Sequence, residues 1–277
     1  MEKIIQQGRG LFGVAIAASG IEGLICAHLG LTVRGVPWFP GNQILAYFIA
    51  IVLTLTGLCV VAKIQTRSVA TVLGFLFFLF ALYPELPRVI ARPMDLSVRS
   101  VFFEALAISA SALILAGTLT EPGSGRRPWD WVADKLIASG PYLFAASLLV
   151  FGIDHFLILD FIASLVPAWL PWHLFWAYLT GSAFVAAGIS IAVKWMERWA
   201  AFLLGIMFAL WVLILHSPRV VTAVRSHDPN AQNEWSSTFI ALAMCGGCWI
   251  YALHAERRRV GSGSHRSFAT GSQCECL

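Results

Sequence analysis

The chain has 277 residues, of which 58% are hydrophobic and 12% charged, and its formal net charge is +4 at pH 7. Soluble domains carry about 25% charged residues, and a globular fold of this length cannot bury so much apolar surface. The composition therefore excludes an ordinary water-soluble domain and predicts an all-α membrane protein. The small positive charge reflects basic loops, so we expect the lipid bilayer as partner and no nucleic acid.

Apolar runs mark the membrane-spanning helices. A helix needs about 20 apolar residues to cross the hydrocarbon core. Eight runs approach that length, at 11–30, 43–62, 68–83, 100–119, 139–160, 173–193, 199–216 and 236–254. If the N-terminus is cytoplasmic, 13 of the 19 Lys and Arg residues fall on the cytoplasmic side. Because cytoplasmic loops are enriched in Lys and Arg, both termini are predicted to be cytoplasmic.

An internal repeat divides the chain. With one gap-free offset of 131 residues, segment 38–89 aligns with 169–220, and 16 of 52 positions are identical. The chain is therefore predicted to be two four-helix repeats of the same orientation, related by an axis along the membrane normal. The expected domains are a first repeat at 1–120, a cytoplasmic linker at 121–137, a second repeat at 138–255 and a disordered cytoplasmic tail at 256–277.

Ionisable residues within membrane segments are functional candidates, because charge in lipid is costly and usually faces the bundle interior. In the predicted topology such residues gather in the outer half or at the outer rim. We therefore expect a polar pocket that opens to the outer face. Its candidate residues are Glu22, Glu104, Asp154, His155, His173, Tyr178 and His216, with Arg88 and Arg219 just beyond.

Asp154 and His155 are adjacent, and a buried carboxylate beside an imidazole would tune its tautomer and basicity. The structural alternative is that Glu22 and Asp154 only form ion pairs with Arg88 or Arg219. His173 and His216 lie where helices are predicted to begin and end, which is compatible with a structural role for each. Together with His155 they could contact a quinone or a haem, but no spacing in the chain is diagnostic of a metal site.

Two further features concern packing. Cys245 and Cys248 share a helix face, so a thiol pair is possible, although a close helix-packing patch with Gly246 and Gly247 is the preferred interpretation. The Pro–Trp–Pro hinges at 36–40 and 166–171 are predicted to lie at the outer membrane interface. There they would roof the pocket or anchor the helices.

The second repeat resembles the DoxX-like family of bacterial membrane proteins. The resemblance covers about 152–216 well and 20–119 weakly. Its motifs correspond here to His155, to the two prolines Pro167 and Pro171, and to Tyr178 with Gly181. It implies four-helix bundles in the bacterial inner membrane, linked in some members to respiratory or thiol-redox complexes. The first repeat departs from the pattern, since Gly23 stands where His155 would align.

Three functions follow as hypotheses. The first is an accessory subunit of a membrane redox system, quinol- or thiol-linked, whose outer pocket contacts a quinol or an oxidoreductase partner. The second is a small-molecule transporter or binding protein built from two parallel repeats. The third is a structural assembly factor whose polar groups only hold helices together. No nucleophile–base pair can be identified, so catalysis by this chain alone stays open.

Overall fold

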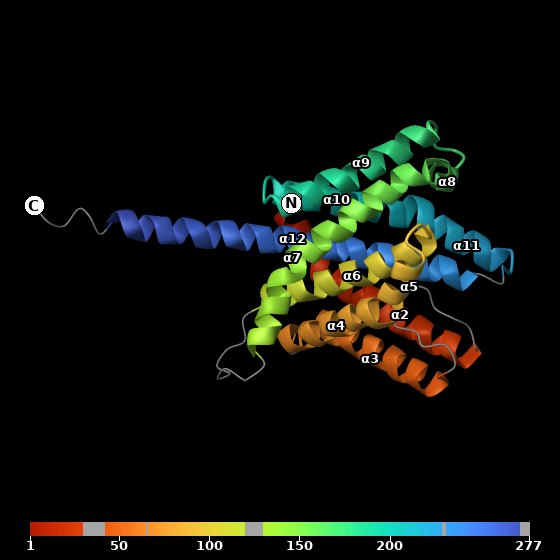
Figure 1. Ribbon diagram of the computed structural model, residues 1–277, viewed down its shortest axis with the longest axis horizontal. Coiled ribbons are helices and arrows are strands. Elements are labelled where there is room, and N and C mark those ends of the chain that lie inside the picture. The colour runs from red at the N-terminus through yellow and green to blue at the C-terminus, as the bar shows by residue number, and fades with distance from the viewer. Residues whose placement is uncertain (30–41, 65, 120–129, 229–230, 272–277) are drawn as a thin grey trace, which may run out of the picture.

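The computed structural model describes residues 1–29, 42–64, 66–119, 130–228 and 231–271, and within these ranges all regular structure is helical (Figure 1). The described residues contain eight helical segments long and apolar enough to cross a membrane. This confirms the predicted all-α architecture with eight candidate spans. They are Glu2–Leu29, Gln43–Ala62, Arg67–Ala91, Leu96–Gly117, Trp131–Leu157, His173–Ala192, Glu197–Arg225 and Ala231–Arg259.

The first half of the chain forms the first four spans. Its helices are α1 (Glu2–Ile5), α2 (Gly8–Leu29), α3 (Gln43–Ala62), α4 (Thr66–Phe80), the π segment η1 (Ala81–Glu85), α5 (Leu86–Ala91) and α6 (Leu96–Gly117). Helix α3 begins at a side-chain cap, because Asn42 accepts a hydrogen bond from the Leu45 amide. Asp95 caps α6 in the same way, accepting from the amides of Ser97 and Val98. Such caps satisfy amides that have no partner within the helix.

The second half forms the other four spans. Its helices are α7 (Asp130–Leu157), α8 (Leu159–Leu165), α9 (His173–Ala192), α10 (Glu197–Trp211), the π segment η2 (Val212–His216), α11 (Ser217–Arg225) and α12 (Ala231–Gly271). The sequence predicts that one span ends at His216. Instead, helix continues through η2 and α11 to Arg225 without a break.

Each of the two π segments precedes a proline by two residues, Pro87 after η1 and Pro218 after η2. Proline has no amide hydrogen, and its ring clashes with the carbonyl one turn earlier. A π turn widens the helix locally and accommodates this defect. Ser217, the first residue of α11, donates a hydrogen bond of 2.7 Å from its hydroxyl to the Val212 carbonyl at the start of η2. The spans therefore run on past their prolines, with a wide turn in each.

Helices α6 and α12 lie at the centre of the bundle (Figure 1). They contact each other, and each also packs against both halves: α6 against α4 and α7, and α12 against α10 and α2. The outer pairs are α2 with α3 and α7 with α9. Cys245 and Cys248 of α12 are fully buried, and the Cys245 thiol lies 3.3 Å from the Gly205 carbonyl oxygen of α10. Both thiols thus pack between helices, as preferred from the sequence.

The structure differs from the expected domain ends in two places. Residues 130–137 of the predicted linker belong to α7, and the helical backbone of α12 continues through Gly271, where disorder is expected. At the start of that tail, Arg257 donates to the Thr118 carbonyl and Arg258 to the Glu197 carboxylate, so side-chain contacts hold this turn of the helix. The hinge at 36–40 lies outside the described residues.

Candidate functional site

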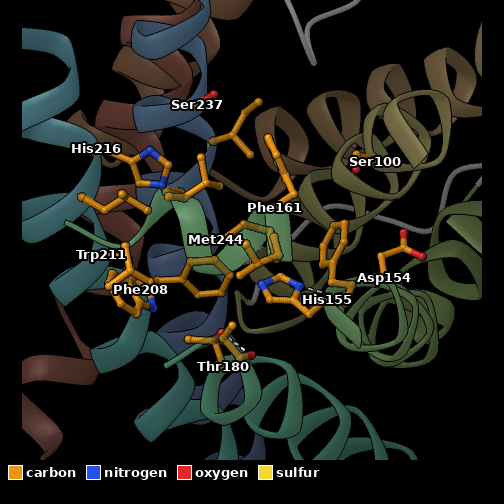
Figure 2. Close-up of a pocket in the computed structure, with 18 of the residues that line it drawn as sticks. Ser100, Asp154, His155, Phe161, Thr180, Phe208, Trp211, His216, Ser237 and Met244 are labelled. Atoms are coloured by element: carbon orange, nitrogen blue, oxygen red, sulfur yellow. Dashed lines mark hydrogen bonds between the residues drawn. The ribbon is translucent and has the colours of Figure 1, made fainter. Parts of the chain in front are cut away.

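A pocket of about 390 Å³ opens at one end of the bundle, between α6, α7, α8, α9, α10, α12 and the η2–α11 segment (Figure 2). We refer to this end as the pocket end. Its walls are mainly aromatic and aliphatic, and its polar groups come from six different helical segments. The polar lining residues are Ser100, Glu104, Asp154, His155, Thr180, His216, Arg219, Asn233, Glu234 and Ser237. The aromatic ones are Phe151, Phe161, Trp176, Phe184, Phe208 and Trp211.

His155 presents a hydrogen-bond acceptor to the pocket. Its Nδ1 atom lies 2.7 Å from the Phe151 carbonyl oxygen, one helical turn earlier. Because a carbonyl can only accept, Nδ1 carries the hydrogen, and Nε2 of the neutral ring is left with a lone pair. The ring also packs against Phe184, with the centroids 5.0 Å apart. The imidazole is thereby held in one orientation and one tautomer.

His216 faces the same space from the opposite wall (Figure 2). It is the last residue of η2, so the wide π turn sets its position. Its Nδ1 atom is buried and has no hydrogen-bond partner within the protein. A buried polar atom without a partner is costly, and in native structures it commonly marks a place where water or a ligand binds.

Asp154 does not orient His155. Its carboxylate points away from the neighbouring imidazole in Figure 2, and its Oδ1 atom lies 2.5 Å from Nη2 of Arg99 on α6. The predicted Asp154–His155 pairing is therefore wrong, and the Phe151 carbonyl fixes the tautomer instead. The physical reason is helical geometry, since consecutive side chains point about 100° apart around the axis. The alternative pairing with Arg219 is also wrong, because Arg99 takes that place.

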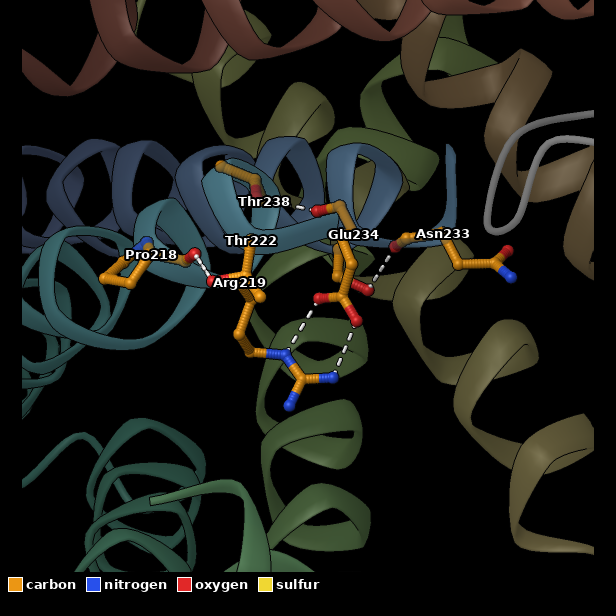
Figure 3. A network of polar contacts seen from close by, with 7 residues as sticks. Pro218, Arg219, Thr222, Asn233, Glu234 and Thr238 are labelled. Carbon is orange, nitrogen blue, oxygen red and sulfur yellow. Dashed lines mark hydrogen bonds and ion pairs between the residues drawn. The ribbon is translucent and has the colours of Figure 1, made fainter. Parts of the chain in front are cut away.

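Arg219 and Glu234 join α11 to α12 beside the pocket (Figure 3). Nε of Arg219 lies 2.8 Å from Oε2 of Glu234, and Nη2 lies 2.6 Å from Oε1. Two parallel hydrogen bonds of this kind fix both side chains more firmly than a single contact. Both residues line the pocket, so this ion pair forms part of its wall.

The pocket contains five of the nine predicted site residues: Glu104, Asp154, His155, His216 and Arg219. The other four lie elsewhere. Glu22 is buried in α2, where its Oε1 atom accepts a 2.7 Å hydrogen bond from Ser236. Arg88 pairs with Glu85 at 2.9 Å. Tyr178 is half exposed on α9 beside Phe156, and His173 begins that helix away from the pocket lining.

Sequence reasoning missed two kinds of site residue. The first is Arg99, whose partner Asp154 is 55 positions away, so no local pattern connects them. The second is the aromatic wall, because Phe and Trp in membrane helices usually indicate only lipid contact. Trp176, Ala177 and Thr180 did offer a signal, since their spacing on α9 places them on one helix face. Among the described residues, no group of three or more His, Cys, Asp or Glu side chains is arranged to hold a metal ion.

Comparison with known proteins adds one match. Residues 144–245 match the model of a family described as "Domain of unknown function (DUF8561)". Apart from Ser100 and Glu104, every residue that lines the pocket falls within this matched range. No curated protein and no solved structure matches the chain.

Proposed function

We propose that this chain is an accessory subunit of a membrane redox system, and that its pocket binds the ring of a quinol. The observation that carries the proposal is the pair His155 and His216, which face one aromatic chamber from opposite walls. A quinol has an aromatic ring with hydroxyl groups at opposite edges. The ring would pack against the aromatic walls while each hydroxyl donates to an imidazole nitrogen.

The hydrogen-bonding state of His155 favours the reduced ligand. Its Nε2 atom can only accept, since Nδ1 holds the hydrogen that bonds to Phe151. The Thr180 hydroxyl donates within α9, to the carbonyls of Trp176 and Ala177 at 2.9 and 3.1 Å. The Glu104 carboxylate also lines the pocket and adds acceptor oxygens. An acceptor-rich pocket matches hydroxyl donors better than the two carbonyls of the oxidised quinone.

Pocket size separates a quinol from a haem. Sites for small molecules span about 300–1,000 Å³, and a pocket of about 390 Å³ is near the lower limit. This suits a single substituted ring better than a macrocycle. A thiol-linked function is less favoured, because Cys245 and Cys248 are fully buried and do not line the pocket. Electron transfer would belong to a partner oxidoreductase.

The duplicated fold and its orientation belong to the same proposal. With the offset of 131 residues, α4 coincides with α10 and η1 with η2 at both ends. Lys63 and Lys194, which correspond, both have left-handed backbones, with φ of 65° and 58°. The helix contacts are also matched, since α2 packs on α3 and α12 as α7 packs on α9 and α6. With both termini cytoplasmic in a bacterial inner membrane, the pocket end would face outward.

Transport is the weaker alternative. A transporter must open its site to both sides of the membrane in turn. Beyond the pocket, however, the bundle interior is filled by fully buried side chains such as Phe144, Leu148 and Tyr251. The rings of Phe144 and Tyr251 are stacked, with centroids 6.2 Å apart. Nothing in this packing favours a path from the pocket to the other end.

Binding of a short-chain quinol tests the proposal. Decylubiquinol and its oxidised form would be titrated anaerobically into the purified chain, with affinity measured by calorimetry. We expect the quinol to bind more tightly than the quinone. His155→Phe and His216→Phe should each weaken quinol binding about tenfold, the effect of one lost hydrogen bond. His173→Phe, outside the pocket, is the matched control and should stay within about twofold of the wild type.

Two results would contradict this function. Equal affinity for quinol and quinone would refute the acceptor argument. Unchanged binding in both histidine variants would remove the pocket from the function altogether. If the variants instead lost thermal stability without any quinol binding to the wild type, a structural assembly role would take the place of the redox proposal.

A further inference from the structure

A second cavity of about 470 Å³ lies at the end of the bundle opposite the pocket end. It is formed by the turn between α9 and α10, by the first residues of α10 and by one residue of α12. Its lining residues are Lys194, Trp195, Met196, Glu197, Arg198, Trp199 and Arg259. We call it the basic-turn cavity. Lys194 and Met196 both have left-handed backbones, with φ of 58° and 50°, so the chain reverses sharply here before α10 begins.

Positive charge dominates this cavity and its rim. Two carboxylates are present, Glu197 and Glu256, and each is already paired with an arginine. Arg258 lies 2.6 Å from Glu197, and Arg198 lies 2.7 Å from Glu256. Tyr251 also donates to Glu197. Among the residues that line the cavity, three are basic, Lys194, Arg198 and Arg259, and one is acidic, Glu197, so the lining carries a formal surplus of two positive charges.

Two arginine donors, one in the cavity lining at Arg198 and one beside it at Arg258, have no hydrogen-bond partner. The Nε atoms of Arg198 and Arg258 are buried and make no hydrogen bond within the protein. Buried guanidinium N–H groups are costly to leave unsatisfied, and they bind the oxygen atoms of phosphates and carboxylates well. Glu197 and Glu256 pair with other nitrogens of these two guanidinium groups, and Oε2 of Glu256 is also buried without a partner. An external anion would satisfy the donors that remain.

The site lies at the depth of lipid headgroups. Glu197 and His216 are 19 residues apart along one continuous helical span, which corresponds to about 28 Å at 1.5 Å per residue. The hydrocarbon core is about 30 Å thick, so the two cavities belong to opposite interfaces. Trp195 and Trp199 are 68% and 46% exposed, and exposed tryptophan is typical of the interfacial layer.

We propose that the basic-turn cavity binds the phosphate of an anionic phospholipid. The cationic side chains of the lining, including Nε of Arg198, would hold the phosphate oxygens, while Trp195 and Trp199 pack against the glycerol and upper acyl region. Free inorganic phosphate shares the same oxygen chemistry. The exposed tryptophans favour the lipid as its source, because a free ion would gain nothing from them. This proposal is independent of the quinol pocket.

Native mass spectrometry of the full chain in detergent tests the site. Phosphatidylglycerol and phosphatidylcholine would be titrated separately, and the affinity of the first retained lipid measured. We expect phosphatidylglycerol to be retained preferentially. Lys194→Gln should weaken its retention about fivefold, the effect of removing one basic charge near a membrane surface. Lys194→Arg should preserve retention, which distinguishes a charge requirement from a folding defect.

The first half of the chain supplies a matched control. Lys63 corresponds to Lys194 and shares its left-handed backbone, but Ile64 and Ser68 stand where Trp195 and Trp199 do. Lys63→Gln should leave lipid retention within about twofold of the wild type. An equal loss in both glutamine variants would overturn the site, as would equal retention of the two lipids. Displacement of phosphatidylglycerol by 10 mM inorganic phosphate would support phosphate recognition but overturn the lipid as its source.

Discussion

One segment from each half of this protein follows the same course along the backbone but carries different side-chain chemistry. The segments Thr66–Ala91 and Glu197–Arg225 both begin with a 15-residue helix, pass through a five-residue π turn and continue past a proline. The residues that end the π turns differ: η1 ends in Glu85 and η2 in His216. Glu85 pairs with Arg88 three residues later, within its own span, whereas His216 faces a pocket.

The arginines that follow the two π turns, Arg88 and Arg219, also have different partners. Arg88 is satisfied locally by Glu85, but Arg219 has no acid at that spacing and pairs with Glu234 on α12. Where the first segment has an acid, its arginine is paired within one span, and where the second has a histidine, its arginine links two spans. The comparison teaches that the backbone of this fold does not by itself produce a binding site. The side chains at a few matched positions decide it.

The largest expected contrast between the halves concerns the carboxylates of α2 and α7. Asp154 is paired with Arg99, whose side chain is only 16% exposed, whereas Glu22 contacts a serine hydroxyl. Asp154→Ala leaves a nearly buried guanidinium without its counter-charge, at a cost of about 3 kcal/mol. Glu22→Ala leaves Ser236 bonded to the Gln232 carbonyl and should cost about 1 kcal/mol.

Unfolding of both variants in detergent would measure this difference. The double variant Asp154→Ala/Arg99→Leu removes both charges and should recover most of the lost stability, because an apolar pair can replace a buried ion pair. If Asp154→Ala and Glu22→Ala destabilised the protein equally, the Asp154–Arg99 ion pair would contribute no more to stability than the Glu22–Ser236 hydrogen bond. The distinction drawn between the halves would then fail at these positions.

A smaller contrast is expected at two matched glycines. A Cβ atom at Gly57 would lie 2.4 Å from the Ala17 backbone nitrogen and 2.7 Å from the Gly13 carbonyl oxygen. At Gly188 the nearest atom is Cγ of Leu149, at 2.8 Å, and the nearest backbone atom is the Ala145 carbonyl oxygen, at 3.0 Å rather than 2.4 Å. A side chain can rotate away but helix backbones must separate, so Gly57→Ala should cost about 2 kcal/mol and Gly188→Ala less than about 1 kcal/mol. Thermal unfolding of the two variants checks the order, and a reversed order would contradict it.

Sequence alone predicted the number of candidate spans, because apolar runs of about 20 residues have few alternatives. It also predicted that His155, His216 and Glu104 would belong to one pocket, since charge in lipid must turn inward. It could not predict the partners. Asp154 pairs with Arg99 rather than with its neighbour, and Glu22 pairs with Ser236 at the other end of the chain. Such contacts depend on how helices rotate against one another, which an apolar sequence does not encode locally.

The sequence also did not predict where the two spans that contain these prolines end. Pro84, Pro87 and Pro218 indicate breaks, yet both spans continue through them because a π turn absorbs the missing hydrogen bond. This matters for the site, since the η2 turn positions His216. The alignment of the two halves contained a hint. Pro87 and Pro218 occupy identical positions in it, as expected if the same local geometry is required twice.

The smallest expected difference is between the variants that neutralise Arg219 and Arg88. Both side chains are partly exposed, at 41% and 60%, so neutralising either should change stability by less than about 1 kcal/mol. Arg219→Gln, however, removes the bidentate link that holds α11 to α12 in the pocket wall. If a quinol binds there, it should dissociate about threefold faster from this variant, the effect of about 0.6 kcal/mol lost from the wall.

Arg88→Gln should leave the same rate unchanged, since Arg88 does not line the pocket and its ion pair with Glu85 lies within one span. Stopped-flow dissociation of decylubiquinol, by displacement with excess quinone, measures both. Equal acceleration in the two variants would mean that the arginines act through general charge at the membrane surface. A change confined to Arg219→Gln would instead attribute the effect to one ion pair. The difference between Glu85 and His216 at the ends of the two π turns would then account for the different roles of Arg88 and Arg219.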